Sequence, residues 1–484
     1  MKELKYRTID TATVNEISEF NKIRENNKHR PKFHITPPFG LLNDPNGFCY
    51  FGGEYHLFYQ WFPFGTFHGL KHWMHLTSTD LYNWSEQGSK IIPKENYELH
   101  GAYSGAAFIE NEQAYLFYTG NVKLPNGRDA NQCLAILDSQ NQVVKHPSNP
   151  VISSVPEGYT GHVRDPKIVK HGDHYFMLLG AQREHNLQGC IIAYRSHDLT
   201  TWQFIGELSI EVDAPFEQAY MFECPDLLEV DGQDVLIFSP QGLQANGARF
   251  NNRYNVVYCL GNMDWSALSF KVSFWDEVDR GFDFYAPQTM ANSPSDSTLV
   301  GWAGTDEELP TQALGWVNTL TLPRALSIKD NRLVQVPVNQ LNGVTKKTAF
   351  NIRTNKSQCI KLDSLSFELD INEIKGNVSL ELINESGECF TFKVNNQANS
   401  LLMSRYEYNH HKDDYEFGNV RTHISPNKTS NVKYICDESI IEVFVENGRD
   451  VFTSLFFASE SVHYLKISLE DETEVDINLQ YLTL

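Results

Sequence analysis

The chain has 484 residues, 41% of them hydrophobic and 12% aromatic, and this length is typical of two or three domains with large buried cores. Its formal net charge of -21 argues against nucleic acid or an anionic membrane as the main partner. No apolar run approaches the roughly 20 residues of a membrane-spanning helix, and no signal segment is recognisable at the start.

The eight cysteines are scattered along the chain and form no Cys-x-x-Cys pair. This distribution favours reduced thiols over a disulfide framework or a zinc site. Together with the missing secretion signal, it predicts a cytoplasmic protein.

Residues 13–27 are predicted to form a helix. Thr13 and Glu16 have the spacing of a capping box, and Val14, Ile17 and Phe20 lie roughly on one helical face. The N-terminal helical segment, residues 1–30, carries no chemical motif and is expected to act as a scaffold.

A strand-rich repeat begins near Leu41. An apolar triplet preceded by a turn signal recurs about every 60 residues, as expected when each unit contains a β-hairpin. A second motif agrees, because Ser78–Trp84 resembles Ser196–Trp202 about two units further on. Units of this length hold about four strands each, so residues 31–338 are predicted to form a five-bladed β-propeller. The triplets are Leu57–Tyr59, Leu116–Tyr118, Phe176–Leu178, Leu236–Phe238 and Leu299–Gly301.

The pattern changes after the propeller. Residues 337–347 contain few apolar side chains and are predicted to be a linker. Beyond them, apolar and polar residues alternate, as in Leu365–Ile371, which indicates a C-terminal β-sandwich over residues 348–484. The fold is therefore expected to be all-β. We expect the sandwich to serve stability or oligomerisation, with sugar binding as the alternative.

Acidic residues stand at the entrance to the hairpins of the propeller. Asp44, Asp165 and Glu223 occupy equivalent points of three units, and Ser104 and Tyr285 occupy those of the other two. Equivalent points on successive blades converge on the central channel. The three carboxyl groups are therefore expected to share one pocket.

A pocket with three carboxyl groups has two common uses. Crowding raises the pKa of one acid, while cations and hydrogen bonds keep another acid ionised. Glycoside cleavage requires such a pair of carboxyl groups, one protonated and one ionised. Arg164, next to Asp165 in the sequence, can supply the cation. A metal site is the alternative, but further ligands are not evident nearby, so no metal is expected. The sequence contains no Walker loop, dinucleotide fingerprint or Gly-x-Ser-x-Gly elbow, so no cofactor is expected either.

Four motifs, in this order along the chain, resemble those of glycoside hydrolase family 32. That family contains invertases, sucrose-6-phosphate hydrolases and fructanases. The motifs are Asn43–Gly47, Tyr103–Gly105, Arg164–Pro166 and Glu223–Cys224. The tail also resembles the C-terminal β-sandwich of the family, notably at Ile441–Gly448, so the resemblance spans nearly the whole chain.

The resemblance implies a retaining β-fructofuranosidase that acts on a small fructoside, sucrose or sucrose 6-phosphate. By motif position, Asp44 is the nucleophile, and Glu223 is the general acid that later acts as base. Asp165 holds fructosyl hydroxyls and favours the oxocarbenium-like transition state. Four further residues match family positions that contact the fructosyl ring: Asn43, Gln60, Ser104 and Arg164.

The segment from Phe67 to His75 is rich in histidine. Its histidines imitate the spacing of metal ligands, but the segment lies between hairpin strands, so we interpret it as a rim that meets the leaving sugar. The rim residues are His68, Lys71 and Trp73, and the sequence of Gly69–Trp73 resembles that of cytosolic sucrose-6-phosphate hydrolases. Lys71, with His68 or His72, is hypothesised to bind a phosphate through charge-assisted hydrogen bonds.

Two departures from the family pattern concern the pocket wall. Leu41 and Leu42 stand where the family often has aromatic and Met residues, and His68 stands where some members have Trp. These differences affect the leaving-group preference. A fructan hydrolase, a fructosyltransferase and a non-catalytic sugar-binding propeller therefore remain alternatives, and a homo-oligomer is possible.

Overall fold

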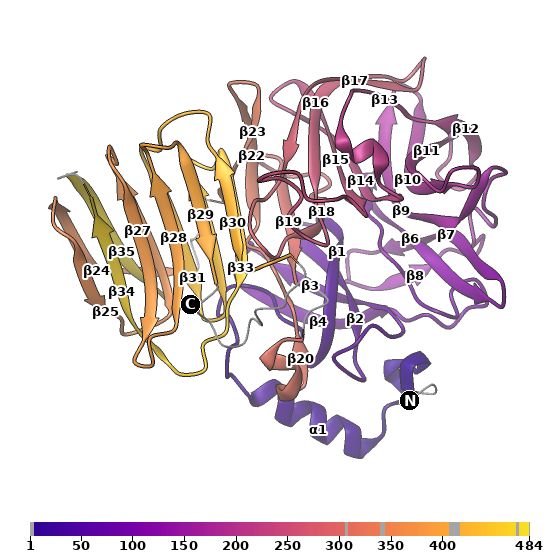
Figure 1. Ribbon diagram of the computed structural model, residues 1–484. Coiled ribbons are helices and arrows are strands. Elements are labelled where there is room, and N and C mark those ends of the chain that lie inside the picture. Colours follow the sequence, from indigo (N-terminus) through magenta and orange to yellow (C-terminus); the bar gives the residue numbers. More distant parts are fainter. Residues whose placement is uncertain (1–3, 305–307, 339–343, 406–416, 471–473, 484) are drawn as a thin grey trace.

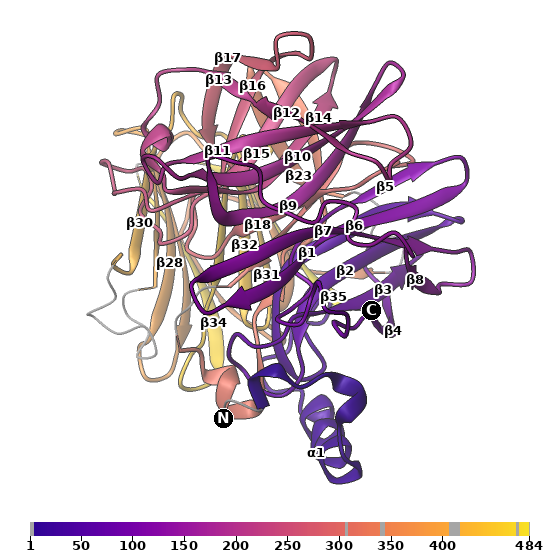
Figure 2. The same cartoon turned by 90° about the vertical axis from the view of Figure 1, so that its right-hand side faces the viewer.

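The computed structural model of the chain describes residues 4–304, 308–338, 344–405, 417–470 and 474–483. Two β-rich parts lie side by side (Figure 1), with the propeller on the right and the sandwich strands on the left. The fold is a five-bladed β-propeller followed by a C-terminal β-sandwich, as the sequence predicted. Figure 2 turns the blades towards the viewer, with the sandwich behind them.

Each propeller blade is an antiparallel sheet whose first strand lies innermost. Blade 1 contains β1 (Gly40–Phe51), β2 (Glu54–Phe62), β3 (His72–Ser78) and β4 (Trp84–Ile91). Blade 2 contains β5 (Ala107–Glu110), β6 (Gln113–Leu124), β7 (Gly127–Leu137) and β8 (Val143–Lys145). Blade 3 contains β9 (Tyr159–His171), β10 (His174–Arg183), β11 (Gly189–Ser196) and β12 (Gln203–Glu207).

The last two blades carry extra short strands. Blade 4 contains β14 (Met221–Val230), β15 (Gln233–Gln241), β16 (Val257–Asp264) and β17 (Ser269–Glu277), with β13 (Ser209–Glu211) parallel to β17. Blade 5 contains β18 (Tyr285–Thr289), β19 (Thr298–Ala303), β22 (Arg324–Lys329) and β23 (Arg332–Pro337). In addition, β21 (Thr319–Leu320) pairs with β19, and β20 (Trp316–Val317) pairs with β1, which joins the last blade to the first.

The repeating triplets form the second strand of every blade. They lie in β2, β6, β10, β15 and β19, where all of these residues are buried. A strand covered on both sides by neighbouring strands and blades can take apolar residues at consecutive positions. The spacing of these strands therefore identified the blades correctly.

The sandwich consists, within the described residues, of two six-stranded sheets. One contains β24 (Thr345–Thr354), β35 (Val475–Thr483), β26 (Ser366–Asn372), β31 (Val432–Asp437), β32 (Ile440–Val445) and β33 (Asp450–Leu455). The other contains β25 (Gln358–Lys361), β34 (Val462–Leu469), β27 (Val378–Asn384), β28 (Cys389–Asn395), β29 (Ser400–Ser404) and β30 (Val420–Ile424). Residues 339–343 of the predicted linker lie outside the described residues, and the predicted domain boundaries stay predictions.

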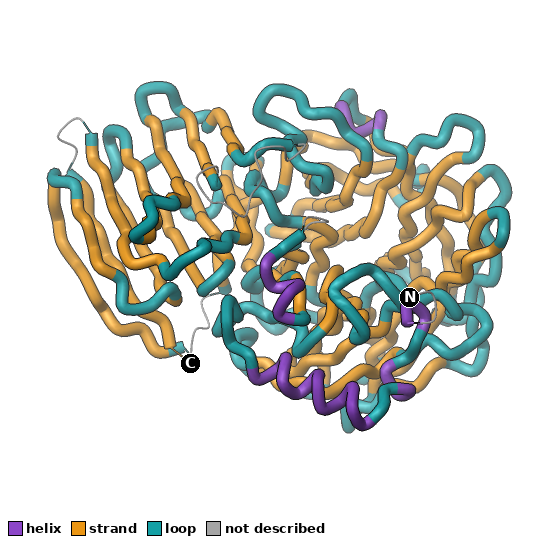
Figure 3. Tube along the Cα trace, turned by 60° about the horizontal axis from the view of Figure 1, so that its bottom comes forward, coloured by secondary structure: helices purple, strands orange, loops and turns teal. Residues whose placement is uncertain are grey.

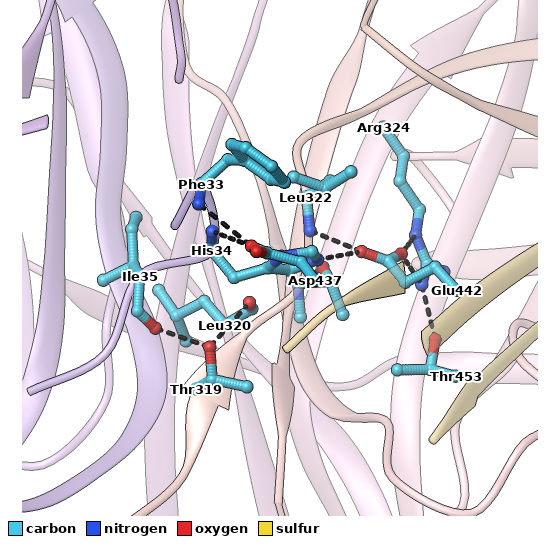
Figure 4. Close-up of polar contacts among 12 residues, drawn as sticks. Phe33, His34, Ile35, Thr319, Leu320, Leu322, Arg324, Asp437, Glu442 and Thr453 are labelled. Atoms are coloured by element: carbon cyan, nitrogen blue, oxygen red, sulfur yellow. Dashed lines mark hydrogen bonds and ion pairs between the residues drawn. The ribbon is translucent and has the colours of Figure 1, made fainter. Parts of the chain in front are cut away.

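Buried charges join the two parts of the molecule (Figure 4). The ring of His34 lies between the carboxylates of Asp437 and Glu442, at 2.8 and 2.9 Å. Arg324, from β22 of the propeller, donates to Glu442 at 2.9 and 2.6 Å and to Thr453 of β33. A buried charge needs such partners to remain stable, so this network fixes the sandwich against the propeller.

The helices are short and peripheral (Figure 3). They are η1 (Leu4–Tyr6), η2 (Ile9–Thr11), α1 (Val14–Glu25), η3 (Pro215–Gln218) and η4 (Pro310–Leu314). The predicted capping box at Thr13 and Glu16 begins α1, on which Phe20 stacks against Phe39 with a 4.2 Å centroid separation. Among the described residues, none of the helices is long and apolar enough to cross a membrane.

Candidate active site

The three acidic residues predicted to be catalytic lie on the innermost strands of three blades. Asp44 lies in β1, Asp165 in β9 and Glu223 in β14, and each lies at an interruption of the regular pairing with the second strand. Such β-bulges turn a side chain out of the sheet. Asp165 and the neighbour of Glu223, Cys224, also have positive φ values of 66° and 48°. This backbone brings carboxyl groups from distant segments to the same cavity.

Asp44 is held by hydrogen bonds from two neighbours. Asn43 Nδ2 donates to its Oδ1 at 3.0 Å, and Ser104 Oγ donates to its Oδ2. Gln60 connects the two donors, because it accepts from Asn43 at 2.7 Å and donates to Ser104 at 2.6 Å. Burial raises the pKa of Asp44, whereas these donors and the ammonium of Lys71 oppose that rise.

Glu223 is held from both sides. Arg164 Nε donates to Oε1 at 2.8 Å, and the second contact of the guanidinium reaches the same oxygen. The hydroxyl of Tyr285 donates to Oε2. Because each carboxyl oxygen has its own donor, the orientation of Glu223 across the cavity is fixed.

Asp165 lies beside the same arginine. The backbone N–H of Cys224 donates to its Oδ2 at 3.0 Å, and Arg164 Nε lies 3.9 Å from that oxygen. Burial raises the pKa of Asp165 to about 7, although Arg164 opposes the rise. Glu223 and Asp44 push the pKa in the same direction as burial. The three carboxyl groups therefore interact electrostatically, as like charges in one pocket do.

The cavity has a volume of about 310 Å³, which is within the usual range of about 300–1,000 Å³ for small-molecule sites. Its walls include nine of the ten residues predicted from the sequence: Asp44, Asp165, Glu223, Asn43, Gln60, His68, Lys71, Ser104 and Arg164. Lys71 donates to Asn43 Oδ1, and its Nζ lies 2.9 Å from His68 Nδ1. The ammonium thus lies next to the residues around Asp44.

Trp73 of the predicted rim and the neighbouring His72 do not line the cavity. Trp73 is fully buried, packs against Phe58 and Tyr118, and donates through Nε1 to the carbonyl of Tyr103 at 3.1 Å. His72 is buried too, and burial lowers its pKa to about 4. Both belong to β3, which is covered on both faces, whereas Lys71 precedes that strand. Trp73 is therefore not placed to stack on a sugar in the cavity.

Several residues that line the cavity were not predicted from the sequence. They are Lys5, Tyr6, Gly69, His100, Tyr103, Lys123, Arg128, His162, Gln241, Tyr254, Tyr285 and Trp302. In the sequence, Tyr285 stood out only because it occupies the position in the fifth unit that is equivalent to the acids of the other units. This repeat position is the one signal that indicates a place in the site. Trp302, from β19, supplies an aromatic wall, with its ring 6.4 Å from that of His68.

Family models match both parts of the chain. Residues 34–337 match the glycosyl hydrolases family 32 N-terminal domain, and residues 334–482 match the family 32 C-terminal domain. The chain belongs to glycosyl hydrolase family 32. Among family 32 relatives, a sucrose-6-phosphate hydrolase of Vibrio alginolyticus is 37% identical over 464 residues, covering 95% of this chain and 92% of the relative. Another, of Bacillus subtilis, is 35% identical and covers 96% of both chains.

Solved family 32 structures have the same fold. A sucrose-6-phosphate hydrolase from Lactobacillus gasseri superimposes with a TM-score of 0.89 at 31% identity, covering 100% of this chain and 99% of that one. A Bombyx mori β-fructofuranosidase in complex with sucrose superimposes with a TM-score of 0.85 at 29% identity, covering 98% of each chain. The similarity to family 32 therefore includes both the propeller and the sandwich.

Proposed function

We propose that this chain is a retaining β-fructofuranosidase that hydrolyses sucrose 6-phosphate. The observation that carries the proposal is the convergence of Asp44, Asp165 and Glu223 from three blades on one cavity. The full-length similarity to sucrose-6-phosphate hydrolases supports the choice of substrate. The proposal includes a cytoplasmic location, in keeping with the eight cysteines, which form no disulfide among the described residues.

In the first step, Asp44 attacks the anomeric carbon of the fructosyl unit while Glu223 protonates the leaving oxygen. A covalent fructosyl-enzyme forms and the phosphorylated glucose leaves. The donors from Asn43 and Ser104 keep the attacking carboxylate oriented, because each of its oxygens has a fixed partner.

In the second step, Glu223 acts as base and takes a proton from water, which attacks the same carbon and releases fructose. The guanidinium of Arg164 contacts Oε1 of Glu223 and holds this carboxyl group in place during the step. Asp165 lies beside Arg164, where its carboxylate is available to accept hydroxyls of the fructosyl ring and stabilise positive charge on it.

Substrate comparison tests the reaction class. We expect the highest kcat/KM on sucrose 6-phosphate, a lower value on sucrose and little turnover of inulin, with free fructose as product. Oligosaccharide products would identify a fructosyltransferase, and preferred cleavage of inulin would identify a fructan hydrolase. Binding of fructosides without any cleavage would identify a sugar-binding propeller and overturn the proposal.

Lys71 and His68 are proposed to bind the substrate near the nucleophile. Because Lys71 donates to Asn43 beside Asp44, its removal disturbs a part of the site that every fructoside uses. Replacing Lys71 by Ala is therefore expected to lower kcat/KM on sucrose and on sucrose 6-phosphate to a similar extent. A loss confined to the phosphorylated substrate would instead identify Lys71 as a phosphate ligand.

A further inference from the structure

The outer part of the cavity is basic although the chain as a whole has a net charge of -21. Asn43, Gln60 and Ser104 of the inner part are each at most 4% exposed. Lys5, Lys123 and Arg128 also line the cavity but are partly or fully exposed, so they lie towards its mouth. These cations come from η1 and from the hairpin of β6 and β7.

Arg128 is placed by the backbone around it. It pairs with Lys123 across the β6–β7 hairpin, so both cations project from the same tip. A side chain on Gly161 of β9 would lie 2.7 Å from Arg128 Cγ and from its carbonyl oxygen, so the stem of Arg128 fits closely against a residue without a side chain. Among the described residues, the guanidinium has no carboxylate partner.

The N-terminal segment brings Lys5 close to Lys123, because Tyr6, the residue after Lys5, contacts Lys123. The Lys123 ammonium lies 3.4 Å from the Tyr6 hydroxyl and 5.7 Å from the centroid of its ring. The carbonyl of Lys5 accepts from Leu70 N at 2.8 Å, which fixes η1 beside the cavity. In the part of the chain that the structure describes, neither ammonium forms an ion pair.

The field at this mouth is positive. Burial, together with the positive charges of Arg164 and Arg128, lowers the pKa of His162 to about 4, although Glu223 opposes this change. Among the described residues these three cations form no ion pair, and an anion bound between them would reduce their mutual repulsion. A phosphate dianion fits this role, because a guanidinium binds two of its oxygens at once and ammonium groups add point charges.

We propose that Arg128, with Lys123 and Lys5, binds the phosphate on the leaving glucosyl unit. This inference rests on the proposed function, since the fructosyl unit must occupy the inner part beside Asp44. The glucosyl unit then points towards the mouth, where its 6-phosphate meets the three cations. Arg128 determines specificity and takes no part in bond cleavage.

The test compares two matched substrates. Arg128→Gln and Lys123→Gln are assayed for kcat/KM on sucrose 6-phosphate and sucrose, and for inhibition by glucose 6-phosphate and glucose. Lys271→Gln is the control, because it removes one exposed positive charge from β17 away from the cavity. Losing a charged hydrogen bond is expected to lower kcat/KM on the phosphorylated substrate by about 10- to 100-fold. The kcat/KM of these variants on sucrose is expected to change little.

The outcomes separate this inference from the proposed function. If the wild type prefers sucrose 6-phosphate and both variants lose that preference, with weaker inhibition by glucose 6-phosphate, the phosphate site is supported. If the wild type prefers it and both variants keep the preference, the phosphate site is overturned while the proposed function stands. If the wild type itself does not distinguish the two substrates, the choice of sucrose 6-phosphate is overturned as well.

Discussion

The carboxyl group of Asp44 belongs to a closed ring of hydrogen bonds. Asn43 donates to Asp44 and Gln60, Gln60 donates to Ser104, and Ser104 donates back to Asp44. These residues come from β1, from β2 and from the segment before β5, so two blades must be in register for the ring to close. The ring orients both oxygens of the proposed nucleophile and offsets part of the cost of burying it.

Replacing Ser104 by Ala tests this ring. The variant loses the donor to Asp44 Oδ2 and leaves Gln60 without its acceptor, so kcat is expected to fall by about 10- to 100-fold with little change in Tm. The control is Ser379→Ala, which removes a serine–carboxylate hydrogen bond to Glu381 in the sandwich. Unchanged kcat in the Ser104 variant would contradict the proposed orientation of Asp44.

Residues inside short motifs could be placed from the sequence, whereas isolated ones could not. Asp44 and Asn43 lie in one turn motif, and their side chains line the cavity as expected. Trp73 was misplaced because its neighbours gave no sign that β3 is buried on both faces. Arg128 carries no local signal, because its position depends on how β7 lies against β9 and on the missing side chain of Gly161.

At the scale of strands, the active site depends on irregular backbone. The pairing of β18 with β19 is interrupted after Tyr285. In the three blades that carry the acids, the pairing of the innermost strand is interrupted at the acid. Ala286, next to Tyr285, has a φ of 45°, which costs about 1–2 kcal/mol for a residue with a side chain. Packing interactions between the blades must offset this cost, so the conformation of the active site depends on how the blades pack.

Gly180 in β10 provides a test of that coupling. A side chain there would overlap the carbonyl oxygen of Phe222, the residue before Glu223 in β14. Gly180→Ala is therefore expected to displace β14, lower kcat at least tenfold and reduce stability by about 1–3 kcal/mol. In the control, Gly65→Ala, the added methyl group meets only the partly exposed ring of Phe67, so activity and stability should change little. Normal kcat in Gly180→Ala would show that Glu223 does not depend on this contact.

The blades were predictable because one buried strand per blade recurs at a constant spacing. The pairing of β20 with β1 was not, since a two-residue strand has no periodicity and pairs with a segment far away in the sequence. The bulges were missed for a similar reason. Asp165 and Cys224 do not favour positive φ as glycine does, so only the assembled blades reveal their conformation.

At the scale of the whole molecule, the buried ion network joins the propeller to the sandwich (Figure 4). Burial alone would lower the pKa of His34, but its contacts with Asp437 and Glu442 outweigh burial and raise the pKa to about 9. The charged imidazole therefore stabilises the folded state while it is protonated. Its contribution is complete below about pH 6.5 and is lost as the pH rises through about 9.

The variant His34→Gln tests this contribution. Urea unfolding of wild type and variant is compared at several values between about pH 6 and pH 10. The wild type is expected to be more stable at the acidic end, by on the order of 3 kcal/mol, and the difference should shrink as the pH approaches 10. A stability difference that does not change with pH would mean that His34 is neutral in the folded protein.

The roles of Asp44 and Glu223 are the central claim, and chemical rescue by azide tests them most directly. Asp44→Ala and Glu223→Ala are each expected to lower kcat by several decades while the fold survives. With an activated aryl fructoside, azide should rescue Glu223→Ala by attacking the covalent intermediate, giving a fructosyl azide of retained configuration. In Asp44→Ala, azide should attack from the vacated face and give the inverted product. Exchanged configurations, or near-normal kcat in either variant, would contradict the account.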